Sequence, residues 1–110
     1  MIYRFDSALV FFNADHFKSQ VKAMVRQAQI DVRCVLLDAE TMPFVDTTGA
    51  ASLDEVCKAL AERGILFAIA GARAPVRVML DQTGVSQQIG AGCVFPTLQS
   101  AVQALSTPER

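Results

Sequence analysis

The hydrophobic positions of this chain alternate between short continuous runs and stripes in which apolar residues recur every three or four positions. The first two runs, residues 2–5 and 8–12, are rich in aromatic and β-branched residues, which favour β-strands. Asp6 and Ser7 separate the two runs with residue types that favour turns. The start of the chain therefore predicts a β-hairpin.

Two further runs have the length and composition of strands in the middle of a sheet. Residues 32–38 and 65–70 are almost continuously apolar, as strands are when both faces of the sheet are covered. A shorter run at residues 93–95 predicts a last strand.

Four stripes at helical spacing predict amphipathic helices. Asn13 is a candidate N-cap for the first, and Gly64 is a typical stop after the second. Pro75 suits the first turn of the third. The stripes are Phe17, Val21, Met24, Val25 and Ala28; Leu53, Val56, Cys57 and Leu60; Val76, Met79 and Leu80; and Leu98, Ala101, Val102 and Leu105.

The resulting order of elements is β-β-α-β-α-β-α-β-α, which defines the expected fold class. Alternation of strands and helices predicts an α/β domain whose single mixed, mostly parallel sheet has four to five strands and about four helices. The chain has 110 residues, of which 52 % are hydrophobic, enough for one core without disulfide bonds. We expect one domain over residues 1–106 and a tail at 107–110.

Composition narrows the classes of function. A net charge of −1 without a basic cluster argues against nucleic-acid binding. Cys34, Cys57 and Cys93 are widely spaced and accompany a single histidine, so reduced, buried thiols are favoured over a zinc site. No apolar run reaches the ~18 residues of a membrane-spanning helix, and no signal peptide is recognisable, so the chain as given is expected to be soluble. Its start in strand-like sequence favours a domain cut from a longer protein.

Candidate catalytic groups are sparse. His16 is the only histidine, so a hydrolytic triad would have to use it, and it is expected at the exposed rim of the first helix. Neither the dinucleotide nor the P-loop fingerprint is present. Asp38, Glu40 and Asp46 flank the end of a predicted central strand, where ligands of parallel sheets bind. They can bind a cation or serve only as loop acids and a helix cap. Nothing here indicates an enzyme.

The stretch VDTTGAAS at residues 45–52 opens the second helix. Asp46 or Thr47 can cap the helix by accepting a hydrogen bond from a free amide of the first turn. Thr48 would then lie in the first turn, where the helix dipole favours negative charge and a phosphate would be tolerated. Gly49 would keep the backbone open to a partner or kinase. A cap alone and a cap with a regulatory role both remain open.

The sequence resembles the STAS domain family. The resemblance covers nearly the whole chain, and it implies a STAS fold in which the residue at Thr48, or the neighbouring Thr47, is the equivalent of a phosphorylated switch position. Asp46 and Gly49 belong to the same motif as cap and contact residues. The matching segments are VLLD at 35–38, PFVDTTGAA at 43–51, RGI at 63–65, FAIAG at 67–71, VMLDQTG at 78–84 and VFPTLQSAV at 94–102.

STAS domains occur in anti-sigma factor antagonists and at the cytoplasmic end of SulP-type anion transporters. The segment YRFDSALVFFNADHF at 3–17 is similar to the transporter type. The resemblance therefore implies a non-catalytic, regulatory domain on the cytoplasmic side of the membrane in an integral membrane protein that carries sulfate or a related anion. The alternatives are a free-standing antagonist switched by phosphorylation, or a nucleotide-binding module.

The same resemblance implies partners and ligands. The transmembrane domain of the parent transporter is the expected partner, with a regulatory protein or kinase and a homodimer as further candidates. No cofactor is expected. If GTP or ATP binds, or a small anion, the candidate contacts are Asp38, Thr48, Gly71 and Arg73, and no metal ligands are predicted.

Overall fold

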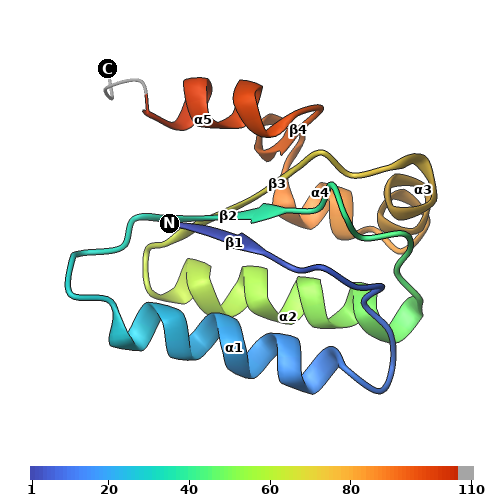
Figure 1. The fold of residues 1–110 in the computed structure, drawn as a ribbon, viewed down its shortest axis with the longest axis horizontal. Coiled ribbons are helices and arrows are strands. Elements are labelled where there is room, and N and C mark those ends of the chain that lie inside the picture. Colours follow the sequence, from blue (N-terminus) through green and yellow to red (C-terminus); the bar gives the residue numbers. More distant parts are fainter. Residues whose placement is uncertain (107–110) are drawn as a thin grey trace.

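The computed structural model describes residues 1–106 and places one four-stranded sheet between two layers of helices (Figure 1). The expected tail, residues 107–110, lies outside the described residues. The elements in chain order are β1 (Ile2–Arg4), α1 (Ala14–Gln27), β2 (Cys34–Asp38), α2 (Thr47–Glu62), β3 (Leu66–Ala70), α3 (Ala74–Gln82), α4 (Val85–Ile89), the short 3₁₀ helix η1 (Ala91–Cys93), β4 (Val94–Phe95) and α5 (Leu98–Ser106).

The strands lie in the order β1-β2-β3-β4, and every neighbouring pair is parallel. In the register, Ile2 lies opposite Leu36, which in turn lies opposite Ala68. The predicted α/β class with a mainly parallel sheet is confirmed, with four strands and five α-helices in the described chain.

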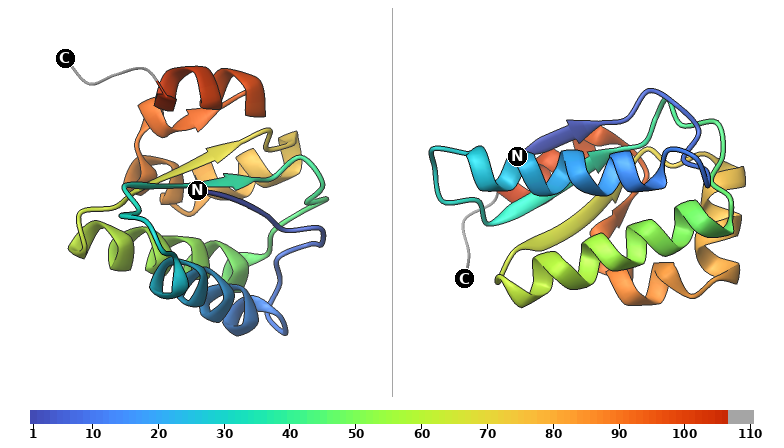
Figure 2. Two further views of the ribbon diagram at one scale, coloured as in Figure 1. Left: turned by 60° about the vertical axis from the view of Figure 1, so that its left-hand side comes forward. Right: turned by 90° about the horizontal axis from the view of Figure 1, so that it is seen from below.

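This strand order determines which face the helices cover. Because each strand is added on the same side of the previous one, right-handed crossovers place the connecting helices on one face of the sheet. Figures 1 and 2 show α1 and α2 side by side on that face, whereas α5, which follows the last strand, lies on the other. Within residues 1–106, a single helix therefore covers the second face.

Two clusters of buried side chains reflect this arrangement. The larger cluster joins the inner faces of α1 and α2 to the sheet and includes residues of α3 and α4. In it, the rings of Phe5 and Phe17 meet edge to face with centroids 5.4 Å apart, which fixes the start of the chain on α1. The smaller cluster joins α5 to the centre of the sheet through Leu36, Ala68, Ala70 and Ala101.

The predicted hairpin is wrong. Residues 8–12 do not return along β1 but continue toward the start of α2, where Leu9 forms an isolated parallel bridge with Val45. The Leu9 amide donates to the carbonyl of Phe44 at 3.1 Å, and the Asp46 amide donates to the carbonyl of Leu9 at 3.2 Å. Leu9 is fully buried, so the burial of this one side chain outweighs the strand propensity of the whole run.

Two smaller expectations also change. Asn13 precedes α1 but makes no capping bond; its side chain instead accepts from the Val10 amide and donates to the Ala8 carbonyl, holding the loop closed. The additional helix α4 follows Gly84, whose φ of 81° breaks the chain direction after α3. α4 is one turn long, too short for a periodic pattern to predict it.

Candidate functional site

The start of α2 is held by a double hydrogen bond to one carboxylate. Asp46 Oδ1 accepts a hydrogen bond from the Gly49 amide at 2.7 Å, which is the N-cap geometry predicted from the sequence. Asp46 Oδ2 accepts from the amide of Phe11 at 3.0 Å. One side chain therefore both caps the helix and ties it to the loop before α1, while Thr47 is the first helical residue rather than the cap.

Gly49 has a structural role that differs from the prediction. Its backbone is buried against the loop before α1, and a Cβ atom at this position would overlap the carbonyl oxygen and carbon of Leu9. The expectation that Gly49 keeps the backbone open to a partner is therefore wrong. The glycine allows α2 to approach the Leu9 backbone closely, which is a requirement of packing.

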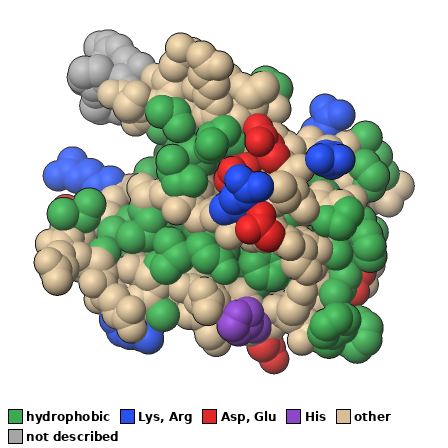
Figure 3. Space-filling model, viewed as in Figure 1, with side chains coloured by type: hydrophobic (Ala, Val, Ile, Leu, Met, Phe, Trp, Pro, Cys, Tyr) green, Lys and Arg blue, Asp and Glu red, His purple; other side chains and the backbone are tan. Residues whose placement is uncertain are grey.

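Thr47 and Thr48 are exposed on the first turn of α2. The segments that meet this turn carry three exposed phenylalanines: Phe11 and Phe12, which are 72 % and 78 % exposed, and Phe44, which is 49 % exposed. The rings of Phe11 and Phe12 contact each other edge to face at 5.6 Å. We call these five residues the α2-start surface; Figure 3 shows hydrophobic side chains at the surface where α1 and α2 begin.

The phenylalanines of this surface were not predicted as site residues. In the sequence, Phe11 and Phe12 read as part of a strand, and Phe44 reads as loop. The available signal was the pair of adjacent phenylalanines, which cannot both face the same side of a strand. They come close to Thr47 and Thr48 only because the loop before α1 crosses the start of α2, where Leu9 pairs with Val45 and the Phe11 amide binds Asp46.

Three of the candidate ligand contacts meet at the carboxyl ends of β2 and β3. Asp38 is buried, and its Oδ1 accepts from the Glu40 amide at 3.2 Å. Arg73 Nε donates to the Glu40 carbonyl at 2.9 Å, and a Cβ on Gly71, whose φ is 75°, would overlap the Glu40 side chain. Thr48 lies instead in the α2-start surface. The hydrogen bonds that Asp38 and Arg73 form in this structure are thus made to other groups of the protein.

A neighbouring carboxylate at the same edge of the sheet has a shifted pKa. Asp6 accepts hydrogen bonds from the Thr41 hydroxyl and from Arg4 Nε, each at 2.7 Å. These two bonds, the one from Thr41 foremost, hold the pKa of Asp6 below its ordinary value. The pKa of Arg4 is raised by the same pairing. The cluster ties the end of β1 to the loop after β2.

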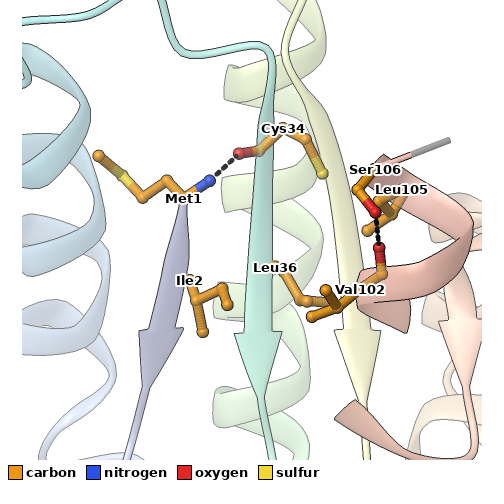
Figure 4. Close-up of a pocket in the computed structure, with 7 residues that line it drawn as sticks. All are labelled: Met1, Ile2, Cys34, Leu36, Val102, Leu105 and Ser106. Atoms are coloured by element: carbon orange, nitrogen blue, oxygen red, sulfur yellow. Dashed lines mark hydrogen bonds between the residues drawn. The ribbon is translucent and has the colours of Figure 1, made fainter. Parts of the chain in front are cut away.

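The thinly covered face of the sheet carries a hollow beside α5. Figure 4 shows Ile2, Leu36 and Val102 directed toward one another across it. At one end the amino group of Met1 donates to the carbonyl of Cys34 at 3.1 Å. Three further surface hollows lie near α1, α2 and α4, and none of the four is lined by Asp38, Thr48, Gly71 or Arg73.

The three cysteines are free thiols. Cys57 is buried, whereas Cys34 and Cys93 are half-buried. Burial raises the pKa of all three, so each is held as the neutral thiol at neutral pH. Among the described residues, no group of three or more His, Cys, Asp or Glu side chains could hold a metal ion. Over the same residues, no helix is long and apolar enough to cross a membrane.

Curated relatives with similar sequences are sulfate transporters. The chain is 36 % identical over 104 residues to a probable sulfate transporter of Mycobacterium tuberculosis, covering 94 % of this chain and 19 % of that protein. It is 27 % identical over 115 residues to sulfate transporter 1.1 of Arabidopsis thaliana, covering 97 % of this chain and 18 % of the relative. The chain thus spans just under a fifth of the length of these relatives.

Solved structures share the fold. The STAS domain of a SulP transporter from Vibrio cholerae superposes with a TM-score of 0.80 at 26 % identity, over 96 % of this chain and 80 % of that one. The murine anion transporter Solute Carrier 26 family member A9 gives a TM-score of 0.87 at 23 % identity, over 97 % of this chain and 18 % of the transporter. A candidate anti-sigma factor antagonist from Thermotoga maritima gives 0.77 at 17 % identity, over 94 % and 84 %.

The family model that matches the chain agrees with these similarities. It describes the STAS domain and matches residues 1–101, which include the whole sheet and the α2-start surface. The resemblance identified from the segments at 35–38 and 43–51 is therefore confirmed. This chain belongs to the STAS domain family.

Proposed function

We propose that this chain is the non-catalytic regulatory and interaction domain of a SulP-type secondary transporter for sulfate or a related anion. The observation that carries the proposal is the 36 % identity to a probable sulfate transporter over 94 % of the chain. In this role the domain works on the cytoplasmic side of the membrane, and its partner is the transmembrane domain of the parent protein.

The contact with that partner is made through the α2-start surface. Isolated apolar side chains are common on protein surfaces, but three exposed phenylalanines around one helix turn form a patch of the kind that marks interaction sites. The backbone of Phe11 is held by the hydrogen bond from its amide to Asp46, and the ring of Phe12 contacts that of Phe11. The helix cap therefore fixes the backbone next to the patch, which lowers the cost of ordering it on binding.

Regulation acts through Thr48. Its hydroxyl is exposed beside the phenylalanines, in a helix turn whose free amides favour negative charge. Phosphorylation would add about two negative charges next to the apolar patch without unfolding α2. A charged group there would weaken an apolar contact, because the phosphate would have to be desolvated in the interface. A protein kinase is then the second partner.

The experiment compares Thr48→Asp and Thr48→Ala in the full transporter. Anion uptake by Thr48→Asp should differ from wild type by several-fold, and Thr48→Ala should retain wild-type uptake. Thr97→Asp is the matched control, because Thr97 caps α5 through the Ser100 amide at 3.0 Å and an aspartate there adds the same charge at another helix start. If both Thr48 variants transport as wild type while the domain stays folded, the regulatory role of Thr48 is refuted.

Two alternatives give different results. A free-standing anti-sigma factor antagonist would bind a purified kinase-type anti-sigma factor, and Thr48→Asp would abolish that complex. The likeness to the Thermotoga protein concerns the fold and does not by itself support this role. A nucleotide module would show amide shifts on addition of millimolar GTP or ATP near residues 38–50, 71–75 or 90–92. Unchanged amide resonances in those segments would exclude the nucleotide module.

A further inference from the structure

The end of the molecule where α1 and α2 finish carries two adjoining grooves with basic rims. One lies between the last turns of the two helices, and the other lies beneath the loop that connects α1 to β2. Arg26 and Arg63 line both grooves, and Lys22 lines the first. Figure 3 shows Lys and Arg side chains at this end of the molecule.

None of the three cations has an acidic partner in the described chain, a feature that they share with Arg73 and Arg77. Within residues 1–106, the ion pairs involve Arg4, Lys18, Arg33 and Lys58, but not Lys22, Arg26 or Arg63. Lys22 and Arg26 are four residues apart on α1, so their like charges face each other and repel. An external anion placed between them would relieve that repulsion.

An exposed apolar side chain projects beside the cations. Ile30, in the loop between α1 and β2, is 76 % exposed although it lines the same groove as Arg26 and Arg63. A large apolar side chain next to basic ones at a loop tip is the pattern of a surface that rests on lipid headgroups, with the apolar group inserted and the cations among the phosphates.

Opposing charges do not cancel the basic character of this end. Asp31 lies in the same loop but pairs with Arg33 at 3.7 Å, so this pair is close to neutral. Glu62 lines the first groove and offsets one cation. The carbonyl ends of α1 and α2 add partial negative charge that falls off within one turn. The remaining positive charge is small, so the surface binds an extended anionic layer better than a single small anion.

From these contacts we infer that the face formed by Lys22, Arg26, Arg63 and Ile30 docks on an anionic membrane surface. The inference rests on the proposed function in one respect: a domain joined to a transporter works next to a lipid bilayer. The contact is weak for the isolated chain and becomes effective when a membrane-embedded partner keeps the domain close to the bilayer.

The test is sedimentation of the full chain with vesicles at low salt. We expect binding to vesicles of equal phosphatidylglycerol and phosphatidylcholine, none to pure phosphatidylcholine, and a steep loss with added salt. The triple variant Lys22→Gln, Arg26→Gln, Arg63→Gln should lower the partition coefficient about a hundredfold, because each basic side chain near an anionic surface contributes roughly fivefold. Ile30→Gln should lower it less.

The matched control removes the same charge elsewhere. The control is the triple variant Arg4→Gln, Lys58→Gln, Arg77→Gln. It changes three exposed cations, none of which lines either groove, and should bind anionic vesicles nearly as wild type does. Equal loss in both triple variants would overturn the inference, as would equal binding to both vesicle types. Binding that millimolar inorganic phosphate abolishes at constant ionic strength would indicate a small-anion site and also overturn it. None of these outcomes depends on Thr48 or on transport.

Discussion

Gly49 in α2 lies directly against the backbone carbonyl of Leu9, a residue forty positions earlier in the chain. The same carbonyl accepts the Asp46 amide at 3.2 Å, so the loop before α1 is attached to the start of α2 by backbone contact on both sides of the helix cap. This attachment positions Phe11 and Phe12 next to Thr47 and Thr48. The proposed contact surface therefore depends on a position at which no side chain fits.

Gly49→Ala should destabilise the domain. Its Cβ would overlap backbone atoms of Leu9, which cannot move aside as a flexible side chain could, so we expect a loss of about 1–3 kcal/mol in the free energy of unfolding. Urea denaturation followed by circular dichroism measures it. Gly92→Ala is the control, because no atom beyond its neighbours along the chain lies within 4 Å of a Cβ there. Equal stability of the two variants would show that α2 does not pack against Leu9 as described.

Removing the side-chain cap at Asp46 should destabilise the domain more than replacing its carboxylate with an amide. Asp46→Ala deletes the acceptors of both the Gly49 and the Phe11 amides, and loss of an N-cap alone costs about 1 kcal/mol. Asp46→Asn keeps one carbonyl oxygen and should lose less stability. Amide hydrogen exchange at Gly49 and Phe11 should accelerate in Asp46→Ala. Unchanged exchange at Phe11 would contradict the bond between this carboxylate and the loop.

The carboxyl group of Asp6 should titrate below its ordinary range. Because its folded-state pKa is lowered, its contribution to stability is present above the unfolded-state pKa and is lost as the pH falls through the folded-state pKa. Thr41→Val should raise the pKa of Asp6, since the hydroxyl bond is the largest single cause, and Arg4→Gln should raise it as well, since Arg4 contributes both a hydrogen bond and a positive charge. Carboxyl carbon chemical shifts measured between pH 2 and 6 (roughly the range where Asp titrates) check this. An unchanged pKa of Asp6 in Thr41→Val would contradict the role of the hydroxyl bond.

The cysteines should react slowly with alkylating agents. Burial raises the pKa of Cys34, Cys57 and Cys93, and the thiolate is the reactive form. Cys57 should be slowest, because it is buried and its Sγ is directed at the Gln88 carbonyl, 3.8 Å away. Mass spectrometry after iodoacetamide treatment, with and without urea, measures each site. Alkylation of Cys57 at the same rate in folded and unfolded protein would contradict this burial.

The sequence alone determined the elements whose residues follow a long, regular period. The stripe Leu53, Val56, Cys57 and Leu60 is buried as predicted, and α2 ends before Gly64, whose φ is 73°. The apolar runs at 32–38 and 65–70 became β2 and β3, the two central strands. The cap at Asp46 was also predictable, because it joins residues three positions apart and depends on local geometry alone.

Only the tertiary structure decided the features that join distant segments. Strand propensity in residues 8–12 predicted a hairpin, but burying Leu9 beside Val45 stabilises the domain more than pairing with a short edge strand would. Propensity reports a preference of single residues, whereas the partner of a strand depends on contacts formed by the whole chain. For the same reason the role of Gly49 and the grouping of Phe11 with Thr48 could not be read from sequence spacing. They arise where a loop crosses the start of a helix, and that crossing exists only in the folded chain.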